Sequence, residues 1–206
     1  GIADTLSFAQ DAVQLTLGAR RQNVVSDTFD GSTGARTARY DAGATSPAAA
    51  VLVKVNNRVS VYGNYIEGLS QGGTAPGTAA NAGEVFPPFK SKQKEVGVKV
   101  DMGGFASTLS LFEITRPGAY TDPVSNLYSF GGEQRNRGLE LGFFGEATRG
   151  LRLLGGIAYT EAKMTKTAGG VNQGRYATAL PKWQAKLGVE WDVPALPGLT
   201  LTGNAL

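Results

Sequence analysis

The chain has 206 residues, a formal net charge of +3, no cysteine and no histidine. The missing cysteines exclude disulfides and thiolate metal sites, and the missing histidines remove the usual general base of hydrolases. Acidic and basic residues are interspersed, which is typical of a mixed polar surface rather than of a nucleic-acid interface. We therefore expect no enzymatic activity, no resident cofactor or metal site, and no nucleic-acid partner.

Alternation of apolar and polar residues predicts β-strands along most of the chain, because successive side chains of a strand point to opposite faces. Near the N-terminus, for example, Val13, Leu15 and Leu17 are separated by the polar residues Gln14 and Thr16. No run approaches the length of an apolar transmembrane helix. The pattern predicts about nine strands, over residues 11–22, 48–55, 58–67, 93–102, 105–115, 136–147, 150–161, 182–193 and 199–206.

The clearest alternation lies at residues 183–193, where every odd position is apolar and every even position is polar or glycine. Trp183 and Trp191 bracket the apolar positions, and eight residues span about 26 Å of strand. Tilted by about 40°, this becomes roughly 20 Å, close to the apolar band of about 25 Å that aromatic girdles flank in outer-membrane barrels. The strand by itself fits a membrane barrel and a soluble β-sandwich equally well.

The connections between the predicted strands favour the barrel. Short turns alternate strictly with four long segments, over residues 23–47, 68–92, 116–135 and 162–181. Loops beyond about 12–15 residues are uncommon in compact soluble domains, whereas outer-membrane barrels have short periplasmic turns and long extracellular loops. The pattern therefore predicts an all-β, antiparallel up-and-down transmembrane barrel whose first and ninth predicted strands run outward. Charged residues between the apolar positions, such as Glu95 and Glu140, would then face the lumen and pair across neighbouring strands.

From residue 58 onward the chain carries an ordered set of motifs. They are RVSVYGNY at 58–65, EGLSQGG at 67–73, NAGE at 81–84, PPFKSKQKEVGVK at 87–99, SLFEI at 110–114, GGEQRNRGLEL at 131–141 and GLRLLGGIAY at 150–159. In this order they resemble the barrel of TonB-dependent ferric-siderophore receptors. The resemblance covers residues 50–204 and extends more loosely over residues 3–49.

The resemblance implies a receptor in the bacterial outer membrane that takes up a ferric siderophore, with the TonB complex supplying energy through a plug domain. It also implies that residues 1–206 are part of a single barrel domain, an incomplete portion of about nine strands from a barrel of about 22, with neither plug nor signal peptide. The portion alone would be inactive, would meet outer-membrane lipid, and is expected to self-associate when isolated. A general porin barrel and a soluble β-sandwich binding module are the alternatives.

Cargo contacts in such receptors come from plug apices, extracellular loops and the upper lumen. The candidates are therefore aromatic and arginine side chains of the predicted long loops, which suit iron chelates with catechols or negative charge: Phe86, Phe89, Tyr120, Tyr128, Arg175 and Tyr176. Trp183 is expected in the outer membrane girdle and Trp191 in the periplasmic one.

Overall fold

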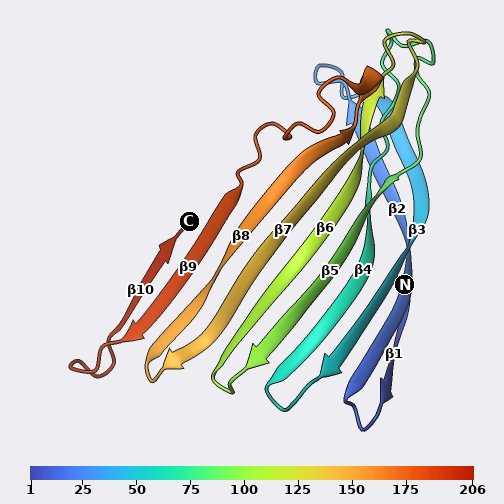
Figure 1. The fold of residues 1–206 in the computed structure, drawn as a ribbon. Coiled ribbons are helices and arrows are strands. Elements are labelled where there is room, and N and C mark those ends of the chain that lie inside the picture. The colour runs from blue at the N-terminus through green and yellow to red at the C-terminus, as the bar shows by residue number, and fades with distance from the viewer.

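A computed structural model describes all 206 residues as one curved antiparallel sheet (Figure 1). The strands pair in chain order without a crossover, which confirms the all-β, up-and-down topology. A 3-10 turn, η1, spans Ala168–Gly170, and no helix is long and apolar enough to cross a membrane. The strands are β1 (Ile2–Phe8), β2 (Val13–Phe29), β3 (Arg36–Lys54), β4 (Val59–Ser70), β5 (Phe89–Asp101), β6 (Phe105–Thr121), β7 (Tyr128–Thr148), β8 (Leu151–Lys166), β9 (Trp183–Asp192) and β10 (Thr200–Ala205).

The register divides the sheet into an apolar face and a polar face. Residues directly opposite each other on paired strands share a face, so rows of side chains can be followed across the sheet. One such row forms part of the apolar face: Leu6, Leu15, Val51, Gly63, Val96, Leu111, Leu139, Tyr159 and Trp183. A neighbouring row on the polar face runs through Gln14, Tyr62, Ser110, Glu140 and Gln184.

The apolar face has no second layer to cover it. Only 10 of the 206 residues are buried, and Trp183 is 63% exposed. A β-sandwich would bury such a face between two sheets, so the β-sandwich alternative is wrong. The side chains that form a core in a soluble protein here form a surface.

Two of the four predicted long loops are largely strand. Residues 23–47 belong mostly to the β2–β3 hairpin, which leaves only residues 30–35 between the strands. Residues 116–135 likewise form the top of the β6–β7 hairpin, with a connection at residues 122–127. The predicted extent of these loops is therefore wrong, because both faces of these strand halves carry polar side chains and alternation no longer marks a strand. Segments 71–88 and 167–182 are long connections, as expected.

Ten strands are present rather than about nine, because β1 precedes the first predicted strand. Its alternation is interrupted by Asp4, which lies opposite Leu17 on the apolar face. The turn that follows uses Ala9, Gln10 and Asp11, all with positive φ, so neither Gly nor Asn marks it in the sequence. Turns of two to seven residues lie at one end of the sheet, whereas the other end carries the two long connections and the two extended hairpins with their six-residue tips (Figure 1).

Candidate functional site

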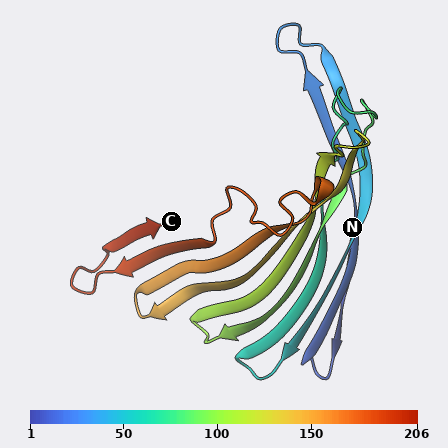
Figure 2. The same cartoon turned by 45° about the horizontal axis from the view of Figure 1, so that its top comes forward.

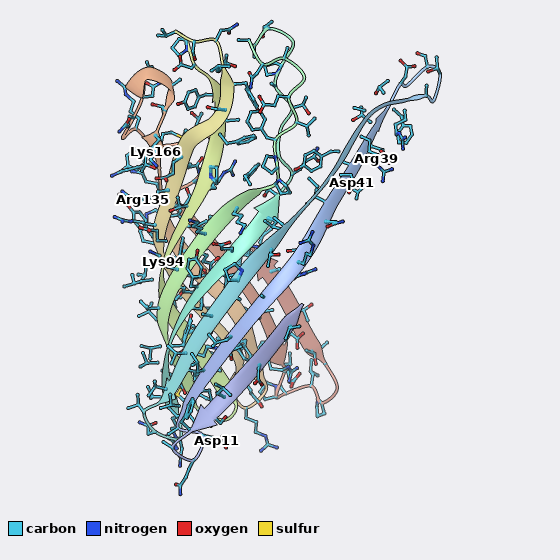
Figure 3. All side chains as sticks on the ribbon, turned by 90° about the vertical axis from the view of Figure 1, so that its right-hand side faces the viewer. Asp11, Arg39, Asp41, Lys94, Arg135 and Lys166 are labelled. Carbon is cyan, nitrogen blue, oxygen red and sulfur yellow. The ribbon has the colours of Figure 1, made fainter.

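The end of the sheet that carries the longer connections is the candidate site for contact with a ligand. The β2–β3 hairpin projects farthest from the remaining strands, and segment 71–88 and the β6–β7 hairpin lie beside one another (Figure 2). Arg39 and Asp41 lie on the projecting hairpin, whereas Asp11 marks the opposite, short-turn end (Figure 3). We call the long-connection end the outer end.

Each of the two hairpin tips is closed by an aspartate. Asp30 accepts backbone N–H bonds from Ser32 and Thr33 at 2.9 and 2.7 Å, and Asp122 accepts them from Val124 and Ser125 at 3.0 and 2.8 Å. Because these bonds favour the carboxylate, the backbone bond from Thr33 lowers the pKa of Asp30. The backbone bond from Ser125 likewise lowers the pKa of Asp122. The tips are therefore short, self-capped turns on extended strands.

Four aromatic rings pack together beneath the tip of the β6–β7 hairpin. Phe86 lies 5.6 Å from Tyr128 and 5.3 Å from Phe130, and Phe89 lies 5.4 Å from Phe130, between ring centroids. We call these four residues the aromatic cluster. Three of them are sequence-predicted candidates; Phe130 was missed because the motif around it gives no sign that segment 71–88 returns to this hairpin.

Segment 71–88 is tied to both hairpins. The side-chain amide of Asn81 donates to the main-chain oxygen of Tyr128 at 3.0 Å and accepts from its N–H at 2.9 Å. Asn126 donates to the oxygen of Thr78 at 2.8 Å. On the other side, the N–H of Gly72 donates to the hydroxyl of buried Tyr40 on β3 at 3.0 Å. The backbone that carries the aromatic cluster is thus tied by hydrogen bonds to both hairpins.

The structure places the other three candidates outside this cluster. Tyr120 lies on β6 opposite Ser129, and Arg175 and Tyr176 lie on segment 167–182, which folds back along β8. The Tyr176 ring carries the Lys182 ammonium 4.2 Å from its centroid, and its hydroxyl donates to Glu161 at 3.2 Å. Tyr176 therefore packs on the side of β8 that bears Glu161, the side continuous with the apolar face.

The polar face forms a second feature, below the outer end. Glu95 accepts hydrogen bonds from the Tyr62 hydroxyl at 2.5 Å and from Gln93 at 3.1 Å, and Lys99 lies 4.9 Å from the centre of the Tyr62 ring. Both carboxylate oxygens of Glu95 therefore already accept hydrogen bonds from neighbouring residues of the sheet. Tyr62 was not predicted, because only the cross-strand register brings it beside Glu95.

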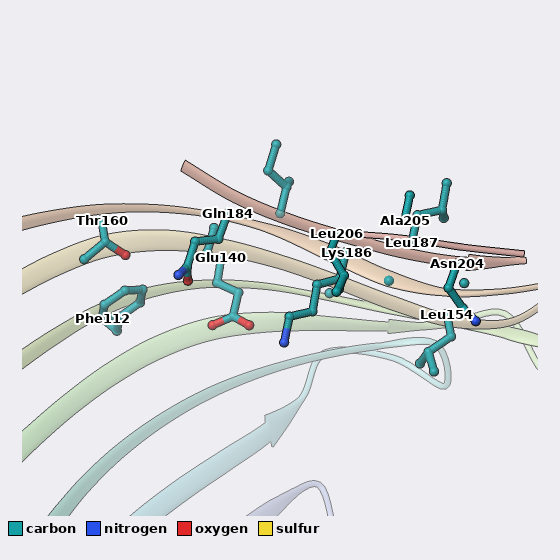
Figure 4. A pocket seen from close by; sticks show the side chains of 16 residues that line it. Phe112, Glu140, Leu154, Thr160, Gln184, Lys186, Leu187, Asn204, Ala205 and Leu206 are labelled. Atoms are coloured by element: carbon teal, nitrogen blue, oxygen red, sulfur yellow. The ribbon is translucent and has the colours of Figure 1, made fainter. Parts of the chain in front are cut away.

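Glu140 differs from Glu95, because it has no hydrogen-bond or ion-pair partner within the chain. It lines a shallow hollow of about 640 Å³ together with Lys186, Gln184 and Phe112. Glu140 and Lys186 point to one side of the sheet, and Leu187 and Ala205 to the other (Figure 4). The hollow presents one carboxylate and one ammonium to whatever occupies this side.

Trp183 and Trp191 lie on the apolar face at the two ends of β9. Trp183 packs against Tyr159, with ring centroids 4.9 Å apart, and Trp191 lies opposite Leu151 and Leu201. They are 63% and 43% exposed. Amphipathic rings at both ends of an uncovered apolar band are the arrangement found at the two interfaces of a membrane.

Comparison with known proteins identifies relatives along the whole sheet. Residues 2–205 match the family model described as "TonB dependent receptor-like, beta-barrel". The chain is 42% identical to the ferrichrome receptor FcuA of Yersinia enterocolitica, covering 100% of this chain and 28% of that protein. It is 30% identical to the ferrioxamine B receptor of Salmonella typhimurium, covering 97% of this chain and 28% of the relative.

A solved structure gives the same result. The chain resembles BauA, the ferric preacinetobactin receptor of Acinetobacter baumannii, with 50% identity and a TM-score of 0.80 over 98% of this chain. The match covers 30% of BauA. The chain therefore spans less than a third of the length of these relatives.

Proposed function

Because the chain belongs to the β-barrel of the TonB-dependent receptor family of the outer membrane, we propose that the whole protein takes up a ferric siderophore across that membrane. Members of this family are transport receptors rather than enzymes. The observation that carries the proposal is the unbroken family match over residues 2–205. The named cargoes of the relatives, ferrichrome, ferrioxamine B and ferric preacinetobactin, support a siderophore-bound iron as the substrate class.

The proposal assigns the two faces of the sheet. The apolar face meets lipid, the polar face lines the lumen, and the outer end lies outside the cell. Trp183 then belongs to the outer girdle and Trp191 to the periplasmic girdle. Residues 1–206 act as part of one barrel domain, and a preparation of this chain alone would associate through its uncovered apolar face.

The aromatic cluster is the best-supported cargo contact within the chain. Its supporting backbone is held by Asn81, which bonds the main chain of Tyr128, and by Tyr40, which accepts from Gly72, so binding would cost little ordering of the protein. Aromatic faces suit both aromatic chelating groups and the apolar parts of a siderophore. Tyr120, Arg175 and Tyr176 remain candidates, with Arg175 the one permanent positive charge among them.

The lumen-facing hollow is the proposed contact for a plug domain that couples to the TonB complex. Glu140 supports this assignment, because a carboxylate without a partner in the wall can accept hydrogen bonds from an inserted domain. Glu95 is less available, since both of its oxygens already accept bonds. Charge complementarity in a wide lumen would thus hold the plug mainly through β7 and β9.

A diffusion porin shares the alternating strands and loops, and the family match favours the receptor over it. The deciding experiment is growth of a deletion strain under iron restriction on a panel of purified ferric siderophores, complemented by the wild-type gene. We expect loss of growth on one siderophore class and rescue by the gene. Rescue that needs no TonB, or a deletion that instead lowers general permeability to small solutes, would refute the proposal.

A binding measurement links this function to the site. In the complete receptor, Phe86→Ala and Tyr128→Ala should weaken ferric-siderophore binding, measured by quenching of intrinsic fluorescence. Leu196→Ala, an exposed residue in the short turn at the opposite end, is the matched control. If only Leu196→Ala weakened siderophore binding, the siderophore would not bind at the aromatic cluster.

A further inference from the structure

Two arginines lie at the outer end of the polar face, at the two ends of one row of residues. Arg116 of β6 lies opposite Gln134 of β7, which in turn lies opposite Met164 of β8. On segment 167–182, the main-chain oxygen of Arg175 accepts from the N–H of Met164 at 2.9 Å and so continues the row. We call Arg116, Gln134, Met164 and Arg175 the arginine row.

The arginine row lies on the lumen side rather than on the apolar side. Gln134 and Glu140 are an even number of positions apart on β7, so they share the polar face. Tyr176 pairs with Lys163 on the other side of the sheet. Arg175, one residue before Tyr176, therefore points to the polar face as Met164 does.

Neither arginine is neutralised within the chain. Both side chains are exposed, and neither guanidinium forms an ion pair. The next row below them on the polar face contains no acidic residue and consists of Gln93, Ile114, Asn136 and Ala162. The first carboxylate below that row is Glu95, whose oxygens already accept hydrogen bonds. The outer end of the polar face therefore carries positive charge without compensation.

Arg175 also lines a cleft of about 530 Å³ between segment 167–182 and the upper ends of β7 and β8. Gln134, Met164 and Thr167 line the same cleft. The hydroxyl of Thr167 is shielded from solvent and has no hydrogen-bond partner, a state that costs free energy until a partner is supplied. Sites for small ligands have volumes of about 300–1,000 Å³, so this cleft has room for part of a cargo molecule.

The spacing of the two arginines suits a ligand that both can contact. Three strand spacings separate their backbones, roughly 14 Å, and both side chains are long. A guanidinium binds a carboxylate through two parallel hydrogen bonds, and such charge-assisted bonds are stronger than neutral ones. Two such groups at the mouth of a lumen, without a neighbouring acid, attract anions and repel cations.

We propose that the arginine row selects iron chelates with a net negative charge and binds their anionic oxygen atoms at the mouth of the lumen. This inference rests on the proposed function, because it takes the cargo to be a ferric siderophore and the polar face to line the lumen. Free carboxylates and ionised catechols both present such oxygens. A neutral hydroxamate complex leaves both guanidinium groups without an ionic partner. The aromatic cluster carries no charge, so discrimination by charge falls to the arginine row.

The test measures binding of ferric complexes to the complete receptor by quenching of its intrinsic fluorescence. Ferrioxamine B supplies a matched pair of probes. Acetylation of its terminal amine gives a neutral complex, and succinylation gives the same iron centre with an added carboxylate. Ferric enterobactin serves as an anionic catecholate complex, and ferrichrome as a second neutral hydroxamate complex.

The variant R116Q/R175Q removes both guanidinium groups of the arginine row. The matched control, R135Q/R149Q, removes two other arginines that form no ion pair, one on the apolar side beside Gln134 and one at the short-turn end. Heat-modifiable migration on an unboiled gel confirms that each variant forms its barrel.

We expect at least one of the two anionic complexes to bind the wild type roughly 100-fold more tightly than the neutral complexes, given about tenfold for each charged hydrogen-bonding partner. R116Q/R175Q should lose this preference, and R135Q/R149Q should keep it. The anionic complex that binds more tightly shows whether carboxylate or catecholate oxygens are recognised.

Three results would each overturn the proposal. They are binding of both anionic complexes no tighter than that of the neutral ones, a preference that survives in R116Q/R175Q, and a preference that R135Q/R149Q loses to the same degree. TonB-dependent growth on neutral siderophores alone would leave the transport function standing and refute the selection by charge. Charge-selective binding without any TonB-dependent uptake would refute transport and leave the arginine row as an anion site.

Discussion

Replacing Leu141 by arginine tests which face of the sheet meets lipid. Leu141 lies on the apolar face of β7, opposite Leu109 and Ile157. It is four residues from Arg137, the first charge at the outer end, which corresponds to about 13 Å of strand. At a tilt of about 40° this is about 10 Å along the membrane normal, close to the middle of an apolar band of about 25 Å.

An arginine at the middle of a lipid-facing strand destabilises an outer-membrane barrel by about 2–4 kcal/mol. We therefore expect Leu141→Arg to reduce the folding equilibrium in a bilayer roughly 30- to 1,000-fold. Gly142→Arg is the matched control, because Gly142 is the next residue on the same strand, points to the polar face, and a Cβ there has no other atom of the chain within 4 Å beyond its two neighbours in sequence. The same charge at Gly142 should cost little.

The measurement is a guanidinium titration of the receptor refolded in lipid vesicles, followed by tryptophan fluorescence. The midpoint should fall for Leu141→Arg and stay near the wild-type value for Gly142→Arg. If the two variants shift the midpoint equally, or if only Gly142→Arg shifts it, the assignment of the apolar face to lipid is refuted.

Three further predictions concern the outer end and the packing of the wall. Asn81→Ala removes the side-chain hydrogen bonds that hold segment 71–88 to the β6–β7 hairpin. Amide hydrogen exchange in residues 71–88 should therefore become about tenfold faster, while exchange in β4 stays slow. Unchanged exchange in residues 71–88 would contradict the docking of this segment. Gly138→Ala would press a methyl group against a main-chain oxygen of β8. It should lower the free energy of unfolding by about 1–3 kcal/mol in the same titration, whereas Gly142→Ala should not. Equal free energies of unfolding for the two variants would show that the sheet adjusts to the added methyl group without cost. The lowered pKa of Asp122 means that its carboxylate stabilises the tip fully above the unfolded value of about 3.8 and loses this effect as pH falls through the lowered folded value. Exchange protection factors at residues 122–127 should therefore drop in that acidic range, and Asp122→Ala should abolish the drop; a drop that survives the substitution points to another group.

The sequence was most informative where one face of a strand is apolar and the other is polar. The alternation at residues 183–193 and 93–102 predicts β9 and the lower part of β5 almost to the residue, because one apolar face and one polar face impose a period of two. Toward the outer end both faces carry polar side chains, and the strands there continue without that signal. This is why the upper halves of β2, β3, β6 and β7 were predicted as loops.

Turn residues could have corrected part of this error. Asp30-Gly31 and Asp122-Pro123 are dipeptides that favour tight turns, and each lies at the middle of a segment predicted as a long loop. Taken as hairpin tips, they would have extended the flanking strands. No comparable signal existed for the turn after β1, where ordinary residues adopt positive φ.

By itself, then, the sequence determined the class of protein, the alternating directions of the strands and which face of each strand is apolar, since these depend on local alternation and on motif order. Only the tertiary structure decided which loop side chains meet. The aromatic cluster needs Phe86 beside Tyr128, about 40 residues away, and Tyr40 beneath Gly72. The tertiary structure also showed that Tyr176 packs with Glu161 rather than with the aromatic cluster. Such contacts depend on the register of many strands and on how a long segment folds back, and no local pattern encodes either.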